Sequence, residues 1–376
     1  MRIKGLLCLV LALVLLLSGC AAPELPGDPN DANADGICSK VYVEGDSFYV
    51  NGEEWWISGI NTPWQYWNDF EGNFNEEFWD LTFARLKRDK INCTRIWINC
   101  AGMGTVTLSR GGEVKSINQE HWTDLEKLFK IASKHEVYIF ATLLSFDHFK
   151  ETQPGHPHWR EMITSEENSK LFADTYVKEF CTRFGEEEFL FAIDLMNEPD
   201  WVNENEECGQ ISWTDQSYFF GVCADTVHQY CSTPVSVGVG MPKYISDNHV
   251  GNMLSDERLL KLTGLEGAYL DFNSPHYYPW EKPWYHFPFD RTVADWGIDD
   301  SKPCILGECV VNDLDDSGYT LSEEFEMAYN NGYSGVMPWV QHDTNDESGW
   351  GGYSFVSDAA RHMYTVIPEK ILPNEQ

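Results

Sequence analysis

The sequence predicts a (β/α)8 barrel, and two observations carry this prediction. Short apolar runs alternate with amphipathic stretches along the chain, and each run is only five to eight residues long. Strands that are buried on both faces read as continuous apolar runs, which is typical of a parallel sheet. The eight runs occupy residues 55–60, 93–98, 137–144, 190–196, 235–240, 271–276, 304–308 and 335–340. Eight strand–helix units in a chain of this length fit a barrel of this class.

Helix signals fill the gaps between the early runs. Asn75 is a good N-cap residue, and Trp79, Phe83 and Leu86 follow it at helical spacing before the second run. The gap before the third run contains a longer apolar stripe, made by Trp122, Leu125, Leu128, Phe129 and Ala132. An open doubly wound sheet is the alternative architecture, but no glycine-rich phosphate turn follows the first run.

The last gap shows both ends of a helix. Thr320 and Glu323 match a capping box, and Asn331 followed by Gly332 supplies a helix stop. No linker splits this alternation, so residues 38–376 are expected to form one barrel domain. Functional groups of such barrels sit at the C-terminal ends of the strands, so the polar residues that end each run are the candidates.

The N-terminus has the pattern of a secretory signal followed by a lipid-attachment site. Basic residues precede an apolar core that is too short to span a bilayer permanently. The Leu-Ser-Gly-Cys sequence ending at Cys20 resembles the lipobox of bacterial lipoproteins, which implies removal of residues 1–19 and lipidation of Cys20. Residues 20–37 are expected to be a flexible tether. The protein is then expected outside the cytoplasm, on the bacterial cell membrane or cell surface; an ordinary cleaved signal is the alternative.

The composition restricts the partners of the chain. There are 60 Asp and Glu residues against 26 Lys and Arg residues, which gives a formal net charge of −34. Such a surface repels nucleic acid, anionic membranes and polyuronates, so we expect a neutral or cationic partner. We further expect a monomer, and contact with a membrane only through the lipid anchor. The eleven cysteines form no cluster with zinc spacing, so neither a metal nor a cofactor is expected. Cys208, Cys223 and Cys231 could supply a disulfide, but the sequence does not choose the pairing.

Two glutamates end apolar runs of the predicted barrel. Glu198 follows the fourth run and Glu308 ends the seventh. Because burying a lone carboxylate is costly, a glutamate at such a position needs a reason. Cleavage of a glycosidic bond supplies one, since it needs an acid for the leaving oxygen and a carboxylate that attacks or stabilises the anomeric carbon. Either glutamate alone is more often a structural ion-pair member, but the two together favour catalysis.

The residues around these glutamates resemble a known family. Asn197-Glu198-Pro199 at strand four and Gly307-Glu308 at strand seven are similar to clan A glycoside hydrolases, and to glycoside hydrolase family 5 in particular. The resemblance implies a retaining mechanism in which Glu198 is the acid/base and Glu308 is the nucleophile. Asn197 can hydrogen-bond the 2-hydroxyl of the sugar. A retaining enzyme is expected to hold its two carboxyl groups about 5–5.5 Å apart, against ~6.5–9.5 Å for an inverting one.

Further positions match the family. Arg95 resembles the arginine that ends strand two and holds the nucleophile, and His276 with Tyr278 resembles the His-x-Tyr of strand six. Trp339 resembles the tryptophan that floors the subsite on the non-reducing side of the cleaved bond. From charge alone, Arg95 or Tyr278 beside Glu308 is expected to lower the pKa of this carboxyl, whereas Glu198 needs drier surroundings that keep it protonated.

Aromatic residues support a sugar ligand. Indole faces stack on pyranose rings, although the usual role of any single tryptophan is packing. Trp64 and Trp280 are the additional candidates for substrate contacts. The tryptophans in or near the predicted strand-to-helix loops are Trp64, Trp67, Trp201, Trp213, Trp280, Trp284, Trp339 and Trp350.

The substrate is the least constrained part of the prediction. Residues 95–97 (Arg-Ile-Trp) and the loop at 143–149 resemble bacterial and fungal mannanases, whereas Asp200-Trp201 stands where many mannanases have an arginine. β-1,4-Mannan, cleaved internally, is therefore the preferred substrate, and an endo-β-1,4-glucanase or another β-glucan hydrolase is the alternative. A surface lipoprotein that binds glycan without cleaving it is a further hypothesis. Such a protein would have no chemical need for either glutamate.

Overall fold

The computed structural model describes residues 40–372 apart from residues 101, 103, 286, 312–316 and 343–348. The predicted signal peptide (residues 1–19), the tether (residues 20–37) and the lipid-attachment residue Cys20 lie outside the described residues. Within the part that is described, no helix is both long enough and apolar enough to cross a membrane.

The central sheet is the predicted barrel. Its strands are parallel and hydrogen-bonded in the order β11-β10-β9-β8-β5-β4-β13-β12. Bridges from Asn273 to Cys304 and from His276 to Glu308 join β11 to β12 and close the ring. The eight strands are β4 (Ile57–Asn61), β5 (Cys93–Trp97), β8 (Tyr138–Thr142), β9 (Leu190–Asn197), β10 (Val235–Val239), β11 (Ser274–Pro275), β12 (Ile305–Leu306) and β13 (Gly335–Val336). Each coincides with a predicted run, so the predicted fold class is confirmed.

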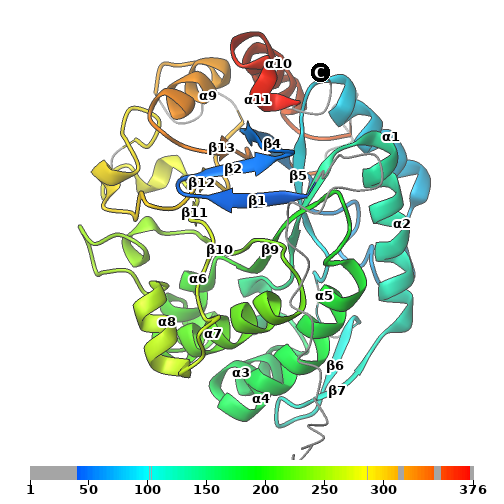
Figure 1. The fold of residues 1–376 in the computed structure, drawn as a ribbon. Coiled ribbons are helices and arrows are strands. Elements are labelled where there is room, and N and C mark those ends of the chain that lie inside the picture. Colours follow the sequence, from blue (N-terminus) through cyan, green and yellow to red (C-terminus); the bar gives the residue numbers. More distant parts are fainter. Residues whose placement is uncertain are drawn as a thin grey trace, which may run out of the picture.

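Helices surround this barrel (Figure 1). They are α1 (Glu76–Arg88), α2 (Gln119–His135), α3 (His156–Thr164), α4 (Glu166–Phe172), α5 (Lys178–Phe184), α6 (Pro199–Glu204), α7 (Trp213–Tyr230), α8 (Asp256–Thr263), α9 (Leu321–Asn330), α10 (Tyr353–Val366) and α11 (Pro368–Ile371). Asn75 caps α1 by accepting from the N–H of Phe78, and Thr320 and Glu323 form the capping box of α9. The predicted apolar stripes of α1 and α2 are buried, because they face the strands.

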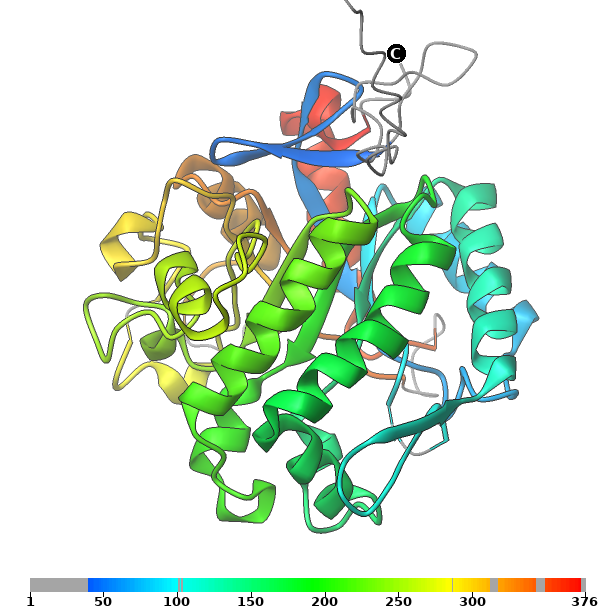
Figure 2. The same cartoon turned by 60° about the horizontal axis from the view of Figure 1, so that its bottom comes forward.

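A small antiparallel sheet covers one end of the barrel, and the sequence analysis did not predict it (Figures 1 and 2). It consists of β1 (Val41–Glu44), β2 (Ser47–Val50) and β3 (Glu53–Trp55). The Phe48 ring lies 5.0 Å from Phe191 and 5.2 Å from Phe272, measured between ring centroids. Phe191 is near the start of β9, so these rings close the N-terminal end of the barrel. The opposite end, where the strands have their C-terminal residues, carries the predicted glutamates.

Two insertions interrupt the strand–helix alternation. A hairpin of β6 (Val106–Leu108) and β7 (Val114–Ile117) follows β5, and a π-helical turn, η2 (Ala173–Val177), joins α4 to α5. The hairpin lies at the end of the barrel opposite the β1–β3 sheet (Figure 2), which is the end where β5 and the other barrel strands stop.

Candidate active site

Both predicted glutamates meet at the C-terminal ends of the strands. Glu198 directly follows β9, and Glu308 follows β12 across the closing bridge with His276. An oxygen of Glu198, an oxygen of Glu308 and a nitrogen of His276 all lie within 4.8 Å of one another. This spacing agrees with the short separation of a retaining pair and not with the wider separation of an inverting pair.

Glu198 has a backbone conformation that points its side chain into the site. Its φ is 51° and its ψ is 56°, the left-handed region that non-glycine residues rarely occupy. The N–H of Glu198 donates to the carbonyl of Gly238 at 2.7 Å, which ties the turn to β10. Pro199 then starts α6, because proline is favoured in the first turn of a helix. Strained residues of this kind concentrate at functional sites, where the surrounding structure holds them.

Arg95 organises the carboxyl groups beneath the site. Its side chain is fully buried, and Nη1 donates to Oε1 of Glu308 at 2.6 Å. Nη2 donates to Asp194 Oδ2 at 2.6 Å and to Asn197 Oδ1 at 2.8 Å. The Arg95 guanidinium also lies 4.3 Å from the ring of Trp97. A buried cation needs such partners, and this network fixes both Glu308 and Asn197.

Asp194 is a site residue that the sequence analysis did not single out. It lies fully buried in the middle of β9, where it accepts from Thr142 Oγ1 at 3.0 Å and from the N–H of Gly238 at 3.0 Å. The Nε of Arg95 also donates to Oδ2 of Asp194, at 3.0 Å, so the guanidinium contacts this carboxylate through two of its nitrogens. An aspartate inside an apolar strand is the signal that could have revealed it, because such a charge requires a buried counter-charge.

Glu308 is held at both of its oxygens. The hydroxyl of Tyr278 donates to Oε2 at 2.6 Å, opposite the Arg95 contact with Oε1. Burial nevertheless raises the pKa of Glu308, and the neighbouring Glu198 raises it further. Arg95 and Tyr278 lower the pKa of Glu308 in the expected direction, but the net shift of this pKa is upward. Desolvation outweighs them because the carboxyl is only 3% exposed.

The surroundings of Glu198 favour its protonated form. Burial raises the pKa of Glu198 to about 7, although the Arg95 charge counteracts part of the rise. Nδ1 of His276 lies 3.0 Å from Oε1 of Glu198. Burial lowers the pKa of His276 to about 4, so its imidazole is neutral near pH 7. His276 is fully buried and therefore positions Glu198, rather than facing the open cleft as a substrate contact.

Two further buried carboxyl groups stand behind Glu198. Oδ1 of Asp200 accepts from the N–H of Gly240 at 2.9 Å, and a Cβ added to Gly240 would lie 2.9 Å from Glu198 Cδ and 3.0 Å from Asp200 Oδ2. Burial raises the pKa of Asp200 well above its ordinary value and that of Glu281 to about 10. Glu281 is therefore neutral when Glu198 titrates, and it adds no negative charge beside Glu198.

Tryptophans gather on one side of the glutamates. Trp339 is half-buried, and its ring centroid lies 5.1 Å from that of Trp97 and 5.9 Å from that of Trp64. Trp67 packs edge-on against Trp64 at 4.7 Å. Because Trp97 also contacts Arg95, this group of tryptophans adjoins the Arg95 network that holds Glu308. The structure thus brings the predicted residues Trp64 and Trp339 together.

A second group of rings belongs to the loops after β9 and β11. Trp280 is 47% exposed, and its centroid lies 5.9 Å from that of Trp201 and 6.2 Å from that of Trp284. These three rings line a cavity of about 420 Å³ together with Met241 and Tyr285. The other loop candidates, Trp213 and Trp350, are buried and serve packing.

Glu198, His276 and Glu308 also have a spacing that could hold a metal ion. An ion there would lie beside the Arg95 guanidinium, which already balances the charge of Glu308. Both oxygens of Glu308 already accept hydrogen bonds, Oε1 from Arg95 and Oε2 from Tyr278. We therefore assign the group to proton transfer and nucleophilic chemistry.

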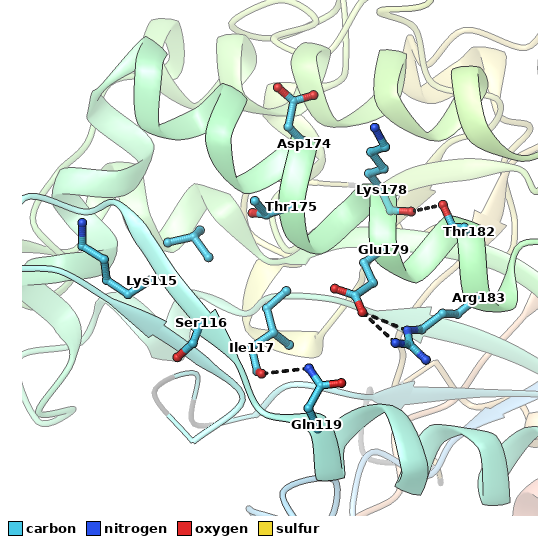
Figure 3. A pocket seen from close by; sticks show the side chains of 11 residues that line it. Lys115, Ser116, Ile117, Gln119, Asp174, Thr175, Lys178, Glu179, Thr182 and Arg183 are labelled. Atoms are coloured by element: carbon cyan, nitrogen blue, oxygen red, sulfur yellow. Dashed lines mark hydrogen bonds and ion pairs between the residues drawn. The ribbon is translucent and has the colours of Figure 1, made fainter.

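A larger cavity, of about 650 Å³, lies on the flank of the barrel between β7 and the η2–α5 segment (Figure 3). Polar and charged side chains dominate it, and Glu179 pairs with Arg183 across one turn of α5. Its lining residues, all of them described, include no aromatic ring. None of its lining residues is one of the predicted site residues, so it is not the candidate active site.

Comparisons with known proteins agree with this geometry. No family model matches the chain. The chain is 24% identical over 340 residues to a mannan endo-1,4-β-mannosidase of Mytilus edulis, covering 82% of this chain and 90% of that protein. It is 21% identical over 332 residues to a mannan endo-1,4-β-mannosidase of Cryptopygus antarcticus, covering 81% and 85% respectively.

Solved structures extend the likeness. The β-mannanase from the blue mussel Mytilus edulis has a TM-score of 0.76 at 22% identity, covering 87% of this chain and 96% of that one. The β-1,4-mannanase of the sea hare Aplysia kurodai has a TM-score of 0.73 at 23% identity, covering 88% and 97%. A glycoside hydrolase family 5 mannosidase from Rhizomucor miehei has a TM-score of 0.54 at 14% identity, covering 88% and 99%. At these identities the likeness establishes the fold.

Proposed function

We propose that this chain is a retaining glycoside hydrolase that cleaves internal β-1,4 bonds of mannan. The observation that carries the proposal is the pair Glu198 and Glu308, whose oxygens approach within 4.8 Å at the strand ends of a (β/α)8 barrel. Tryptophans flank this pair on two sides, as an elongated sugar chain requires. Relatives named as mannan endo-1,4-β-mannosidases support the choice of mannan over β-glucan.

The first step transfers the sugar to the protein. Glu198, protonated below about pH 7, donates its proton to the glycosidic oxygen while an oxygen of Glu308 attacks the anomeric carbon. The C–O bond to the leaving sugar breaks and an ester bond to Glu308 forms. Arg95 and Tyr278 hold Glu308 through one hydrogen bond each, so its orientation is set before the substrate arrives.

The second step releases the sugar. Glu198, now ionised, takes a proton from a water that attacks the anomeric carbon from the side that the leaving group vacated. The ester bond to Glu308 breaks, and Glu198 regains the proton with which it began. His276 keeps the Glu198 carboxyl in place through both steps, because its neutral ring hydrogen-bonds either protonation state. We assign the contact with the 2-hydroxyl to Asn197, whose Oδ1 accepts a hydrogen bond from Arg95.

The test is release of reducing sugar by a soluble form of the protein that begins after Cys20. Mannan, glucomannan, carboxymethylcellulose and mixed-linkage glucan are the substrates, and Glu308→Gln is the matched control. Release from mannan and glucomannan that is lost in Glu308→Gln supports the proposal. Preference for the two glucans replaces the substrate but keeps the mechanism. Binding of a glycan with no release from any of them refutes the enzyme and leaves a non-catalytic binder.

We also propose that the protein is a bacterial lipoprotein that acts outside the cytoplasm as a monomer. The support is the sequence that ends at Cys20, together with the tether-like composition of residues 20–37. The strongly acidic composition suits a neutral polysaccharide, because it neither attracts nor repels an uncharged ligand. Metabolic labelling with a fatty acid should mark the wild type and not Cys20→Ala, and labelling of both would refute the assignment of Cys20.

A further inference from the structure

Two buried cysteines meet at the end of the barrel opposite the glutamates. Cys181 lies in α5, shortly before β9 begins, and Cys231 directly follows α7, shortly before β10 begins. Both side chains are almost completely buried, at 1% and 2% exposure. Their thiol groups hydrogen-bond each other. The sequence analysis considered Cys231 for a disulfide but did not identify Cys181 as its partner.

The backbone brings these two segments into direct contact. A Cβ added to Gly185 would lie 2.3 Å from Cys231 Cβ and 2.5 Å from the carbonyl oxygen of Cys181. Only a glycine therefore permits this approach. The hydroxyl of Thr233 donates to the carbonyl of Gly185 at 3.0 Å, and Nζ of Lys40 donates to the same oxygen at 2.6 Å. The two cysteines are thus held together by the surrounding chain rather than by chance.

The surroundings distinguish the two thiols. The hydrogen bond from Cys181 lowers the pKa of Cys231, and hydrogen bonds from Thr233 and the charge of Lys40 act in the same direction against the effect of burial. The pKa of Cys181 is raised well above its ordinary value, first by the same hydrogen bond and then by burial. Cys231 is therefore the better nucleophile of the pair, and Cys181 is the neighbour that can resolve a mixed disulfide.

We propose that Cys181 and Cys231 form a disulfide bond when the protein meets a small-molecule disulfide such as oxidised glutathione. Because Cys231 is buried in the folded chain, the attack takes place during local opening of the segment between α7 and β10. The thiolate of Cys231 then attacks one sulfur of the oxidant, which forms a mixed disulfide and releases one glutathione thiol. The sulfur of Cys181 then attacks Cys231, which forms the intramolecular bond and releases the second glutathione. Two cysteine thiols are oxidised and one glutathione disulfide is reduced to two thiols, so electrons and protons balance.

The bond encloses the part of the chain that carries the acid/base. Residues 182–230 include β9, Asn197, Glu198 and the whole of α7. Closing a loop of this length reduces the entropy of the unfolded chain, and in a domain of this size the melting temperature should rise by about 6 °C. Because the bond lies at the N-terminal ends of the strands, the catalytic rate should not depend on it.

Peptide mapping of the full chain tests the proposal. The reduced protein is incubated with oxidised glutathione, quenched in acid, denatured and alkylated, and then digested without reductant. We expect a crosslinked peptide joining Cys181 to Cys231 in the wild type and in the control Cys208→Ser, and no such peptide in Cys181→Ser or Cys231→Ser.

The peptide map of the oxidised wild type is sufficient to test the proposal, so the test does not depend on the folding of any variant. Alkylation of both thiols after oxidation overturns the proposal, and so does a crosslink that joins either cysteine to Cys223. The second measurement is thermal unfolding of the wild type with and without oxidation. A rise of about 6 °C that is missing in Cys231→Ser supports the bond, and equal melting temperatures refute its stabilising role.

Discussion

Replacing Tyr278 with phenylalanine removes one donor from the nucleophile and leaves the ring in place. The hydroxyl of Tyr278 donates to Oε2 of Glu308 at 2.6 Å, and Glu308 is only 3% exposed, so no water is positioned to replace the lost hydrogen bond freely. A hydrogen bond to a charged group contributes about 1.5–3 kcal/mol. Since 1.36 kcal/mol corresponds to a factor of ten, kcat/KM should fall about 10- to 150-fold.

The same change should alter the pH profile. Glu308 must be ionised to attack, and the Tyr278 hydrogen bond is one of the factors that lower its pKa against the effect of burial. Without this donor the pKa of Glu308 rises further, so the acidic limb of kcat/KM should move to higher pH. The basic limb, set by Glu198 at about 7, should stay where it is, and the active range should narrow.

The assay is hydrolysis of a soluble mannan-derived oligosaccharide, with kcat/KM measured across pH for the wild type, Tyr278→Phe and the control Tyr364→Phe. Tyr364 lies on α10, where its ring contacts Lys90, away from the site. The melting temperatures of the variants show whether folding is intact. A Tyr278→Phe protein with wild-type kcat/KM and an unmoved acidic limb would refute the assignment of Glu308 as the nucleophile held by Tyr278.

Three further predictions follow from the same geometry. In the wild type, kcat/KM should fall as pH rises through about 7, because the pKa of Glu198 is raised to this value and only its protonated form can donate; a profile flat to pH 9 would contradict this. Gly238→Ala should destabilise the protein by about 1–3 kcal/mol in denaturant unfolding, since its Cβ would lie 2.6 Å from Arg95 Nη2, whereas Gly111→Ala, whose nearest neighbour is at 3.7 Å, should be close to neutral; equal effects would contradict the close packing. Trp339→Ala should lower kcat/KM on mannan about tenfold through loss of ring stacking, and an unchanged value would exclude Trp339 from the sugar-binding surface.

Several features of the site were predictable because they depend on local sequence. Each barrel strand is visible in the sequence as an apolar run. The order of these runs assigns Glu198 and Glu308 to the ends of β9 and β12. Asn75 and Thr320 cap their helices because capping involves residues only two or three positions away. The β1–β3 sheet was not predicted as a separate unit, because only Trp56 separates β3 from β4 and the apolar run at 55–60 contains the end of β3 as well as most of β4.

The sequence by itself determined the fold class, the two glutamates and the residues beside them, since residue type and position along a parallel strand decide which end of the barrel a side chain reaches. Tertiary structure alone decided the electrostatics. The pKa of Glu308 is raised despite Arg95 and Tyr278, and His276 turns towards Glu198 instead of the cleft, because burial depends on segments that are distant in the chain. The pairing of Cys181 with Cys231 has the same origin, since only the packing of α5 against the end of α7 brings the two thiols together.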